Sequence, residues 1–131
     1  MYEITGSGSY KNTVSSNVAS MVNNSQYTPG GMIWRDQEWG PARHAMNAAF
    51  IASQAAASGI NAVANYDFAR SQTEYMMGSN PQNQCFIVGF GENCPKKPHH
   101  RSSSCPASGD CNYQNAGGNN NAGPNPMVGN Q

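Results

Sequence analysis

A run of small residues between positions 42 and 58 is the feature that most constrains how this chain folds. Its alanines gather on one face if the run is helical. Pro41 suits the first helical position, because its missing N–H would be unpaired there anyway, and Gly59 suits the stop. A helix with small side chains along one face can approach its neighbours closely. The sequence therefore predicts a helix packed among other helices in an all-α fold. The alanines on the predicted face are Ala45, Ala48, Ala49, Ala52, Ala55 and Ala56.

Two further helices are predicted on either side of this run. Residues 11–24 carry apolar side chains at helical spacing, and a third helix is expected from a cap at Asn61 to Met77. Residues 28–31 form a turn, and the Gly- and Ser-rich residues 1–10 are expected to be a loop or a frayed end. The expected inward positions are Val14, Val18, Met21 and Val22 in the first helix, and Val63, Tyr66, Thr73, Met76 and Met77 in the third.

The charge balance argues against two classes of partner. Lysine and arginine equal aspartate and glutamate in number, and charged residues make up only 11% of the chain. A neutral, weakly charged chain has no electrostatic hold on nucleic acid or on an anionic membrane. The sequence also lacks an apolar run long enough to span a membrane, and residues 1–6 have neither the basic nor the apolar region of a signal peptide.

The cysteines Cys85, Cys94, Cys105 and Cys111 all lie in the second half of the chain. Their spacing fits no common zinc pattern, which would have paired C-x2-C motifs, so no metal is expected. Cys105 and Cys111 are close enough in sequence for a short disulfide loop in a secreted protein. Buried free thiols are the alternative for Cys85 and Cys94.

A proline-stiffened loop carries the residues best suited to hold a polar ligand. Pro95 and Pro98 fix their own φ angles and lack N–H donors, which excludes regular helix or sheet there. His99 and Arg101 follow directly. Arginine offers a planar fork of donors, and histidine can donate or accept near neutral pH. His100 is expected to support the loop, and His44, in the second predicted helix, to be structural.

The run from Cys85 to Arg101 resembles the histidine signature of glycoside hydrolase family 9, the cellulases with an (α/α)6 barrel. That signature has an apolar run, a spaced glycine, a basic or amide residue, a proline or aliphatic residue, and then His-x-Arg. A pattern of this length is far more specific than a bare His-His-Arg. The matching positions are Gly91, Asn93, Pro98, His99 and Arg101, and Cys85 is a mild departure at the first position.

The helices resemble the same family. Residues 39–50 match its Trp-Gly-x-x-Arg-x-x-x-Asn-Ala-Ala-Phe helix, with Glu38 as one extra residue before Trp39, and residues 66–81 are similar to the helix and turn that precede the histidine loop. The resemblance covers residues 10–129 and implies an incomplete (α/α)6 barrel of about three helices and long loops. Residues 11–131 are then a partial catalytic domain, in which 106–131 form an interrupted Asn/Gly-rich loop.

The resemblance implies an endo-β-1,4-glucanase that hydrolyses internal bonds of cellulose or a related β-glucan with inversion, without a cofactor, outside the cell. His99 matches the active-site histidine, Arg101 its substrate-binding partner, and Trp39 is expected to offer a flat apolar face to a glucose ring; Trp34 is the weaker tryptophan candidate. Inversion needs two carboxyl groups, and the chain has neither the family's Asp-rich motif nor its Asn-Glu context. Alone it is therefore expected to be inactive.

Two other functions stay open from the sequence. The chain fits a non-catalytic carbohydrate-binding remnant that has kept sugar contacts without the carboxylates. Less well, it fits a small Cys/His metal-binding domain built on the cysteines with His99 and His100, which a zinc titration or thiol count would separate. Asp67 and Glu74 are expected on a solvated helix face. Asp36 and Glu38 either meet substrate or pair with a nearby arginine.

Overall fold

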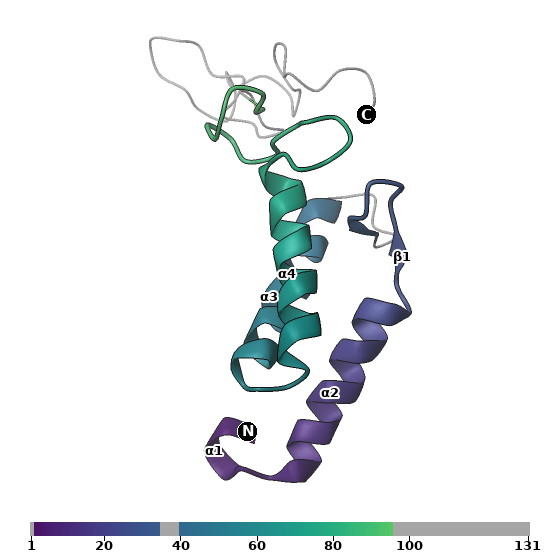
Figure 1. The fold of residues 1–131 in the computed structure, drawn as a ribbon, viewed down its shortest axis with the longest axis vertical. Coiled ribbons are helices and arrows are strands. Elements are labelled where there is room, and N and C mark those ends of the chain that lie inside the picture. The colour runs from purple at the N-terminus through teal and green to yellow at the C-terminus, as the bar shows by residue number, and fades with distance from the viewer. Residues whose placement is uncertain (1, 35–39, 96–131) are drawn as a thin grey trace, which may run out of the picture. The chain divides into compact units, whose positions relative to one another are not determined.

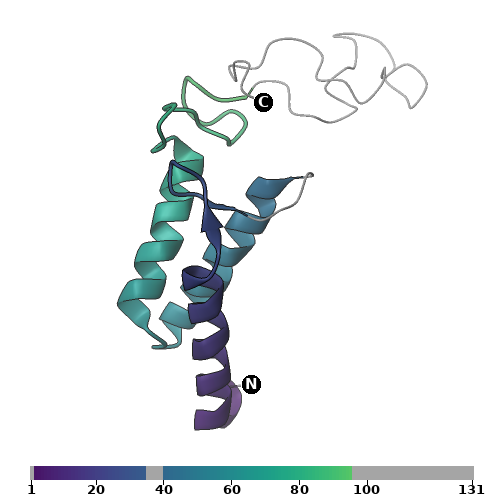
Figure 2. The ribbon, with the colours of Figure 1, turned by 90° about the vertical axis from the view of Figure 1, so that its right-hand side faces the viewer.

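The computed structural model of the chain describes residues 2–34 and 40–95. The chain divides into two compact units, one ending at Met76 and the other beginning at Met77. The first unit is mostly helical (Figures 1 and 2). Its elements are α1 (Tyr2–Thr5), α2 (Gly8–Asn23), β1 (Gln26–Tyr27), β2 (Ile33–Trp34), α3 (Pro41–Ala57) and α4 (Ala62–Met77), the last of which ends in the second unit.

The alanine face of α3 is the centre of the core, as the sequence predicted. Ala45, Ala48, Ala49, Ala52 and Ala55 are all buried. They pack with side chains from α2, β2 and α4 and from the turn after α3. Because alanine side chains are small, a few larger side chains fill the space between the helices and the hairpin. These are Val18, Ile33, Ile60 and Phe68, with Ala69 beside them.

The two ends of α3 follow from its flanking residues. Pro41 occupies the first turn, and Gly40 before it has a left-handed φ of 66° that most side chains disfavour. At the other end Gly59 has a φ of 72°. Its N–H donates to the carbonyl of Ala56 and the N–H of Ile60 donates to that of Ala55, both at 2.9 Å. This pair of bonds is a Schellman motif, and it turns the chain back so that α4 runs opposite to α3 (Figures 1 and 2).

Two expectations at the helices are wrong. Residues 1–10 were expected to be a loop or a frayed end, yet within the described residues 2–10 α1 forms and α2 begins at Gly8. Gly6, with a φ of 65°, makes the break between them, and the Ser58 hydroxyl donates a hydrogen bond to the Glu3 carboxylate, which ties α1 to the end of α3. Such a contact is distant in sequence and leaves no local signal.

The inward face of α4 is the second correction. Val63 and Tyr66, expected inside, are 76% and 60% exposed, and Thr73 and Met77 are exposed as well; Met76 alone of the expected set is buried. The buried face instead includes the amides of Asn65 and Gln72, together with Phe68, Ala69 and Tyr75. The spacing of apolar residues does not identify this face, because two of its positions are polar. Their amides are buried and form hydrogen bonds with backbone groups in the interior.

A small hairpin connects α2 to α3. β1 and β2 are antiparallel, with Gln26 opposite Trp34 and Tyr27 opposite Ile33. The predicted turn between them is confirmed, since the N–H of Gly31 donates to the Thr28 carbonyl at 2.9 Å. The strands themselves carried too few residues to be predicted. Among residues 2–34 and 40–95, no helix combines the length and the apolar character that crossing a membrane requires.

Candidate functional site

The three site residues expected from the sequence, His99, Arg101 and Trp39, lie outside the described residues. The structure describes the chain on both sides of Trp39 and as far as Pro95 before the histidine loop. The described residues therefore show how the segments next to these site residues are held in place. Each flank is described within its own unit.

The loop before the histidine segment is organised by the buried amide of Asn80. Its Nδ2 donates to the Gln84 carbonyl at 2.7 Å. Its Oδ1 accepts hydrogen bonds from the backbone N–H groups of Gln82 at 3.2 Å and Gln84 at 3.1 Å. One side chain thus satisfies three backbone groups within a single turn, which fixes the path of the chain just after α4.

Gln84 then closes the loop that follows. Its buried Nε2 donates to the carbonyls of Cys85 at 3.0 Å and Asn93 at 2.8 Å. The N–H of Cys85 donates to the same Asn93 carbonyl at 3.0 Å, and Asn93 Nδ2 donates to the Asn83 carbonyl at 2.9 Å. Residues 86–92 therefore form a loop whose two ends, at Cys85 and Asn93, are hydrogen-bonded together. We call these bonded ends the base of the loop, and the chain continues from it to Pro95, four positions before His99.

The two cysteines at this base are free and buried. The Cys85 sulfur accepts a hydrogen bond from the N–H of Ile87 at 3.3 Å. No three His, Cys, Asp or Glu side chains in residues 2–34 and 40–95 are placed to hold a metal ion. Cys105 and Cys111, the candidates for a disulfide loop, lie outside these ranges, as does His100.

We expect the Gln84→Met variant to loosen this base. It removes the donor of two carbonyls in a buried place, where an unmet hydrogen bond costs about 1–3 kcal/mol. Hydrogen exchange at the Cys85 amide should then become about tenfold faster or more. Gln82→Met is the matched control, since the Gln82 side chain is exposed and only its backbone N–H bonds to Asn80. Equal exchange rates in both variants would contradict the role given to Gln84.

On the other flank, residues 35–39 lie between Trp34 and Gly40. Trp34 ends β2 and is 38% exposed. Arg43, in the first turn of α3, donates from Nε to Nε2 of the half-buried His44 at 3.3 Å. His44 thus accepts a hydrogen bond from the residue before it on α3. Asp36 and Glu38 lie outside the described residues.

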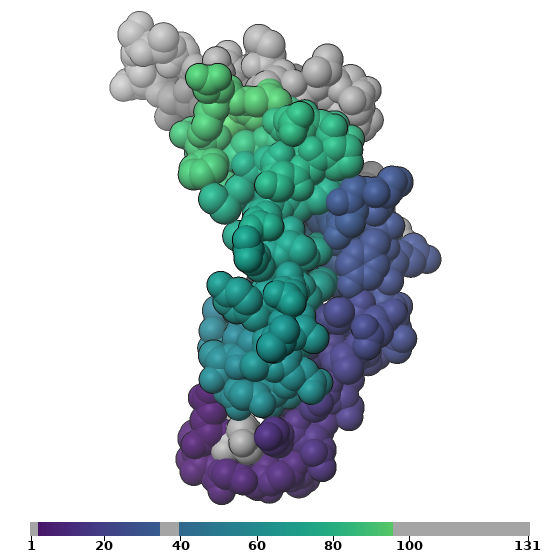
Figure 3. Space-filling view, viewed as in Figure 1, coloured from purple at the N-terminus to yellow at the C-terminus, as the bar shows by residue number. Residues whose placement is uncertain are grey.

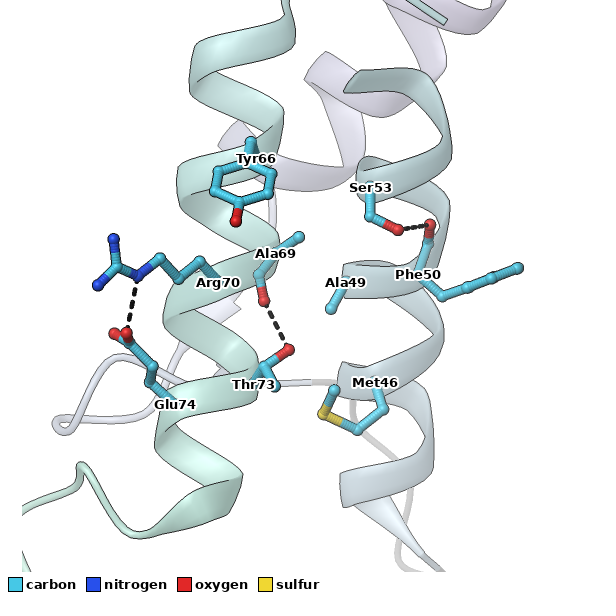
Figure 4. A pocket seen from close by; sticks show the side chains of 9 residues that line it. All are labelled: Met46, Ala49, Phe50, Ser53, Tyr66, Ala69, Arg70, Thr73 and Glu74. Carbon is cyan, nitrogen blue, oxygen red and sulfur yellow. Dashed lines mark hydrogen bonds and ion pairs between the residues drawn. The ribbon is translucent and has the colours of Figure 1, made fainter. Parts of the chain in front are cut away.

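A separate hollow of about 420 Å³ lies between α3 and α4 (Figure 4). Met46, Ala49 and Phe50 line it from α3, and Tyr66 and Ala69 from α4. The chemistry of this hollow is mostly apolar. It contains no pair of carboxyl groups, and therefore lacks what glycoside hydrolysis requires.

The carboxylate at the rim of this hollow is already paired. Glu74 accepts a hydrogen bond from Arg70 Nε at 2.7 Å, one turn away on α4 (Figure 4). That bond and the charge of Glu74 raise the pKa of the Arg70 guanidinium above its usual value. Both side chains are exposed, so the pair contributes little to stability. Asp67 is exposed as well, and the solvated face expected for Asp67 and Glu74 is confirmed.

Sequence reasoning missed the buried amides of Asn80, Gln84 and Gln72. For Gln72 a signal exists: it lies three positions after Ala69 and four after Phe68, on the buried stripe of α4. A polar residue on such a stripe must find hydrogen-bond partners, and it marks a place where another segment meets the helix. Asn80 and Gln84 lie in a loop, where no periodic pattern would identify them.

The chain is similar to several endoglucanases. It is 51% identical over 80 residues to Endoglucanase A of Bacillus pumilus, which covers 59% of this chain and 12% of that protein. It is 44% identical over 86 residues to an endoglucanase of Dictyostelium discoideum, covering 66% of this chain and 11% of the relative. The chain thus spans about an eighth of the length of these relatives, or less.

Solved structures show the same relationship. The endoglucanase of the termite Nasutitermes takasagoensis superposes with a TM-score of 0.72 at 46% identity, over 80% of this chain and 24% of that one. Endoglucanase CelQ of Clostridium thermocellum, complexed with cellobiose and cellotriose, gives 0.70 at 34% identity, over 79% of this chain and 18% of that one. The prediction of an all-α, incomplete (α/α)6 barrel is confirmed.

The family model for glycosyl hydrolase family 9 matches residues 3–130, which is nearly the whole chain. The match includes the small-residue helix α3, the helix α4 and the loop based on Asn80 and Gln84. It also includes the segment that carries His99 and Arg101. The resemblance seen in the sequence is thereby confirmed, and the chain belongs to glycosyl hydrolase family 9.

Proposed function

We propose that this chain forms part of the substrate cleft of an endo-β-1,4-glucanase, which hydrolyses internal β-1,4-glucosidic bonds of cellulose or a related β-glucan with inversion. The observation that carries the proposal is the His99-x-Arg101 segment in a chain that belongs to this family. Relatives of known structure hold cellobiose, cellotriose and cellotetraose, all β-1,4-linked glucose oligomers. The reaction needs no cofactor, and an extracellular location follows from the same family resemblance.

In this proposal His99 and Arg101 bind hydroxyl groups of the sugar next to the bond that breaks. An imidazole and a guanidinium can both donate to ring hydroxyls, and arginine holds its donors in a fixed plane. Hydrogen bonds that tighten as the ring distorts stabilise the transition state more than the ground state, and so raise the rate. His99 is therefore the catalytic residue of this segment and Arg101 a substrate-binding one.

The carboxyl groups that activate water and protonate the leaving oxygen lie outside this sequence in the proposal. Of the described acidic residues, Glu3 accepts a bond from Ser58 and Glu74 pairs with Arg70. None of the seven acidic residues of the sequence belongs to an Asp-x-x-Asp or Asn-Glu motif of the kind that the family uses. The chain alone is thus a binder of β-glucan that lacks the groups for hydrolysis.

We expect the chain alone to bind soluble cellulose weakly and to release no sugar from it. Affinity electrophoresis in a gel containing carboxymethylcellulose should retard the chain, and an assay for reducing ends should stay at background. Trp39→Ala should remove most of the retardation, because stacking on an aromatic face contributes about 1 kcal/mol or more. Trp34→Ala, at the weaker tryptophan candidate, is the comparison variant and should keep more of the retardation than Trp39→Ala. Migration that ignores the polysaccharide would contradict the proposal, and release of reducing ends would show that the carboxylates are present after all.

A further inference from the structure

The side-chain amide of Gln72 joins two segments that lie far apart in the sequence. It is only 1% exposed, on the inner face of α4. The N–H of Ile33 donates to Gln72 Oε1 at 2.7 Å, and Gln72 Nε2 donates to the carbonyl of Gly31 at 3.0 Å. The atoms of the hairpin adjoin those of α4 in the space-filling view (Figure 3). One amide therefore fixes the start of β2 to this helix.

The pairing imitates a neighbouring strand. Gly31 and Ile33 are two residues apart, and a residue of an adjacent parallel strand would also accept from one N–H and donate to the carbonyl two positions earlier. The primary amide of Gln72 supplies that acceptor and that donor from a helix. The Ile33 N–H and the Gly31 carbonyl, which face away from β1, thereby gain hydrogen-bond partners. An unpaired backbone group in such a buried place would cost free energy.

The hairpin needs this support because it is very short. β1 and β2 pair over two residues each, and a hairpin of that size is not stable by itself in water. Three contacts hold it to the helices: the buried side chain of Ile33, the amide of Gln72, and the Tyr27 hydroxyl, which donates to the Val22 carbonyl at 2.6 Å. The next residue, Trp34, begins the connection through residues 35–39 to Gly40, so the position from which that connection starts depends on Gln72.

We propose that Gln72 is a positioning residue for sugar binding, which acts by holding β2 and thereby fixing where the tryptophan-bearing connection leaves the helices. The inference rests on the proposed function, in which Trp39 contacts the glucan. It adds that a buried residue of α4, distant in sequence from both tryptophans, increases the affinity for the sugar by positioning Trp39. Gln72 itself touches no substrate in this account.

The test compares Gln72→Met with Asn65→Leu. Both variants replace a buried amide of α4 by an apolar side chain of similar size, but the Asn65 amide donates to the Ile60 carbonyl at 2.8 Å and not to the hairpin. Both tryptophans of the chain, Trp34 and Trp39, lie in the segment concerned. Their fluorescence therefore reports on this segment alone, and a titration with cellotetraose measures binding through the same signal.

In Gln72→Met, exchange of the Ile33 amide should become about 10- to 100-fold faster, because two backbone groups lose their partner. The affinity for cellotetraose should fall roughly tenfold, which is the loss expected when the bound arrangement of the hairpin is populated about a tenth of the time. Asn65→Leu should leave both quantities near the wild-type values. If Gln72→Met fails to fold, Gln72→Asn, which keeps the amide but shortens its reach, should shift both quantities in the same direction by less.

The outcomes separate this inference from the proposed function. If the wild-type chain binds cellotetraose and the Gln72 variants bind equally well, the positioning role is overturned and the proposed function stands. If the Ile33 amide exchanges at the wild-type rate in the variants, the inference is overturned at its structural step. If the wild-type tryptophans do not respond to the sugar, the Trp39 contact of the proposed function fails and Gln72 is a structural residue only, while the part of the proposal that rests on His99 and Arg101 is tested separately.

Discussion

Replacing His99 by alanine is expected to lower cellulose turnover by roughly 10²- to 10³-fold, the loss typical of one preorganised hydrogen-bond donor in an active site. The measurement needs the family's carboxylates, so the chain is placed in a chimera with the termite endoglucanase, replacing the segment to which it is 46% identical. Because His99 acts on the transition state in the proposed function, kcat should fall far more than KM rises. Thermal unfolding of the chimera should be unchanged.

Two further variants of the chimera sharpen this result. Arg101→Lys keeps the charge but loses the planar fork of donors, and should lower kcat/KM about tenfold. His100→Ala is the control, since it removes the neighbouring imidazole, which is expected to support the loop and not to bind the sugar. A His99→Ala chimera that turns over cellulose as fast as its parent would remove the basis of the proposed function.

Replacing Ile33 by alanine is expected to cost about 2–5 kcal/mol of unfolding free energy, the range for truncating a fully buried aliphatic side chain. Ile33 is 1% exposed and is one of few large side chains in a core made mostly of alanine. A small core has little reserve, because whole domains are stable by only about 5–15 kcal/mol. Urea denaturation followed by circular dichroism gives the change directly.

Ile51→Ala is the matched control for this experiment. The same side chain is removed from α3, but at a position that is 49% exposed, so the expected change is within about 0.5 kcal/mol. Similar losses of unfolding free energy in the two variants would mean that Ile33 of β2 is not part of the hydrophobic core. A large loss at Ile33 alone would confirm that β2 is part of it.

The sequence predicted the helices well because their boundaries are local. Pro41 and Gly59 set the two ends of α3 through their own backbone preferences. The alanines between them recur at helical spacing, so they lie on one face, and this face is buried. The hairpin and α1 were missed because distant residues hold them: Gln72 supports β2, and Ser58 binds Glu3. Propensity within a short window carries no information about such partners.

The face of α4 shows the limit of apolar patterns. Tyr66 was expected inside and is exposed on the hollow beside α3, whereas Gln72 was not expected inside and is buried. A buried amide is stable when it meets backbone groups of another segment, and the pattern of one helix does not show that segment. The site residues His99, Arg101 and Trp39 were found by family resemblance, and their roles remain predictions.

The central claim is that the His99–Arg101 segment binds β-1,4-linked glucose. A titration of the isotope-labelled chain with cellotetraose, followed by nuclear magnetic resonance of the His99 imidazole and the Arg101 amide, tests it directly, with α-1,4-linked maltotetraose as the control sugar. The account predicts that both signals shift with cellotetraose and not with maltotetraose. Signals that stay unchanged, that respond equally to both sugars, or that move only around Tyr66 and Arg70 beside the hollow of α3 and α4 would contradict it.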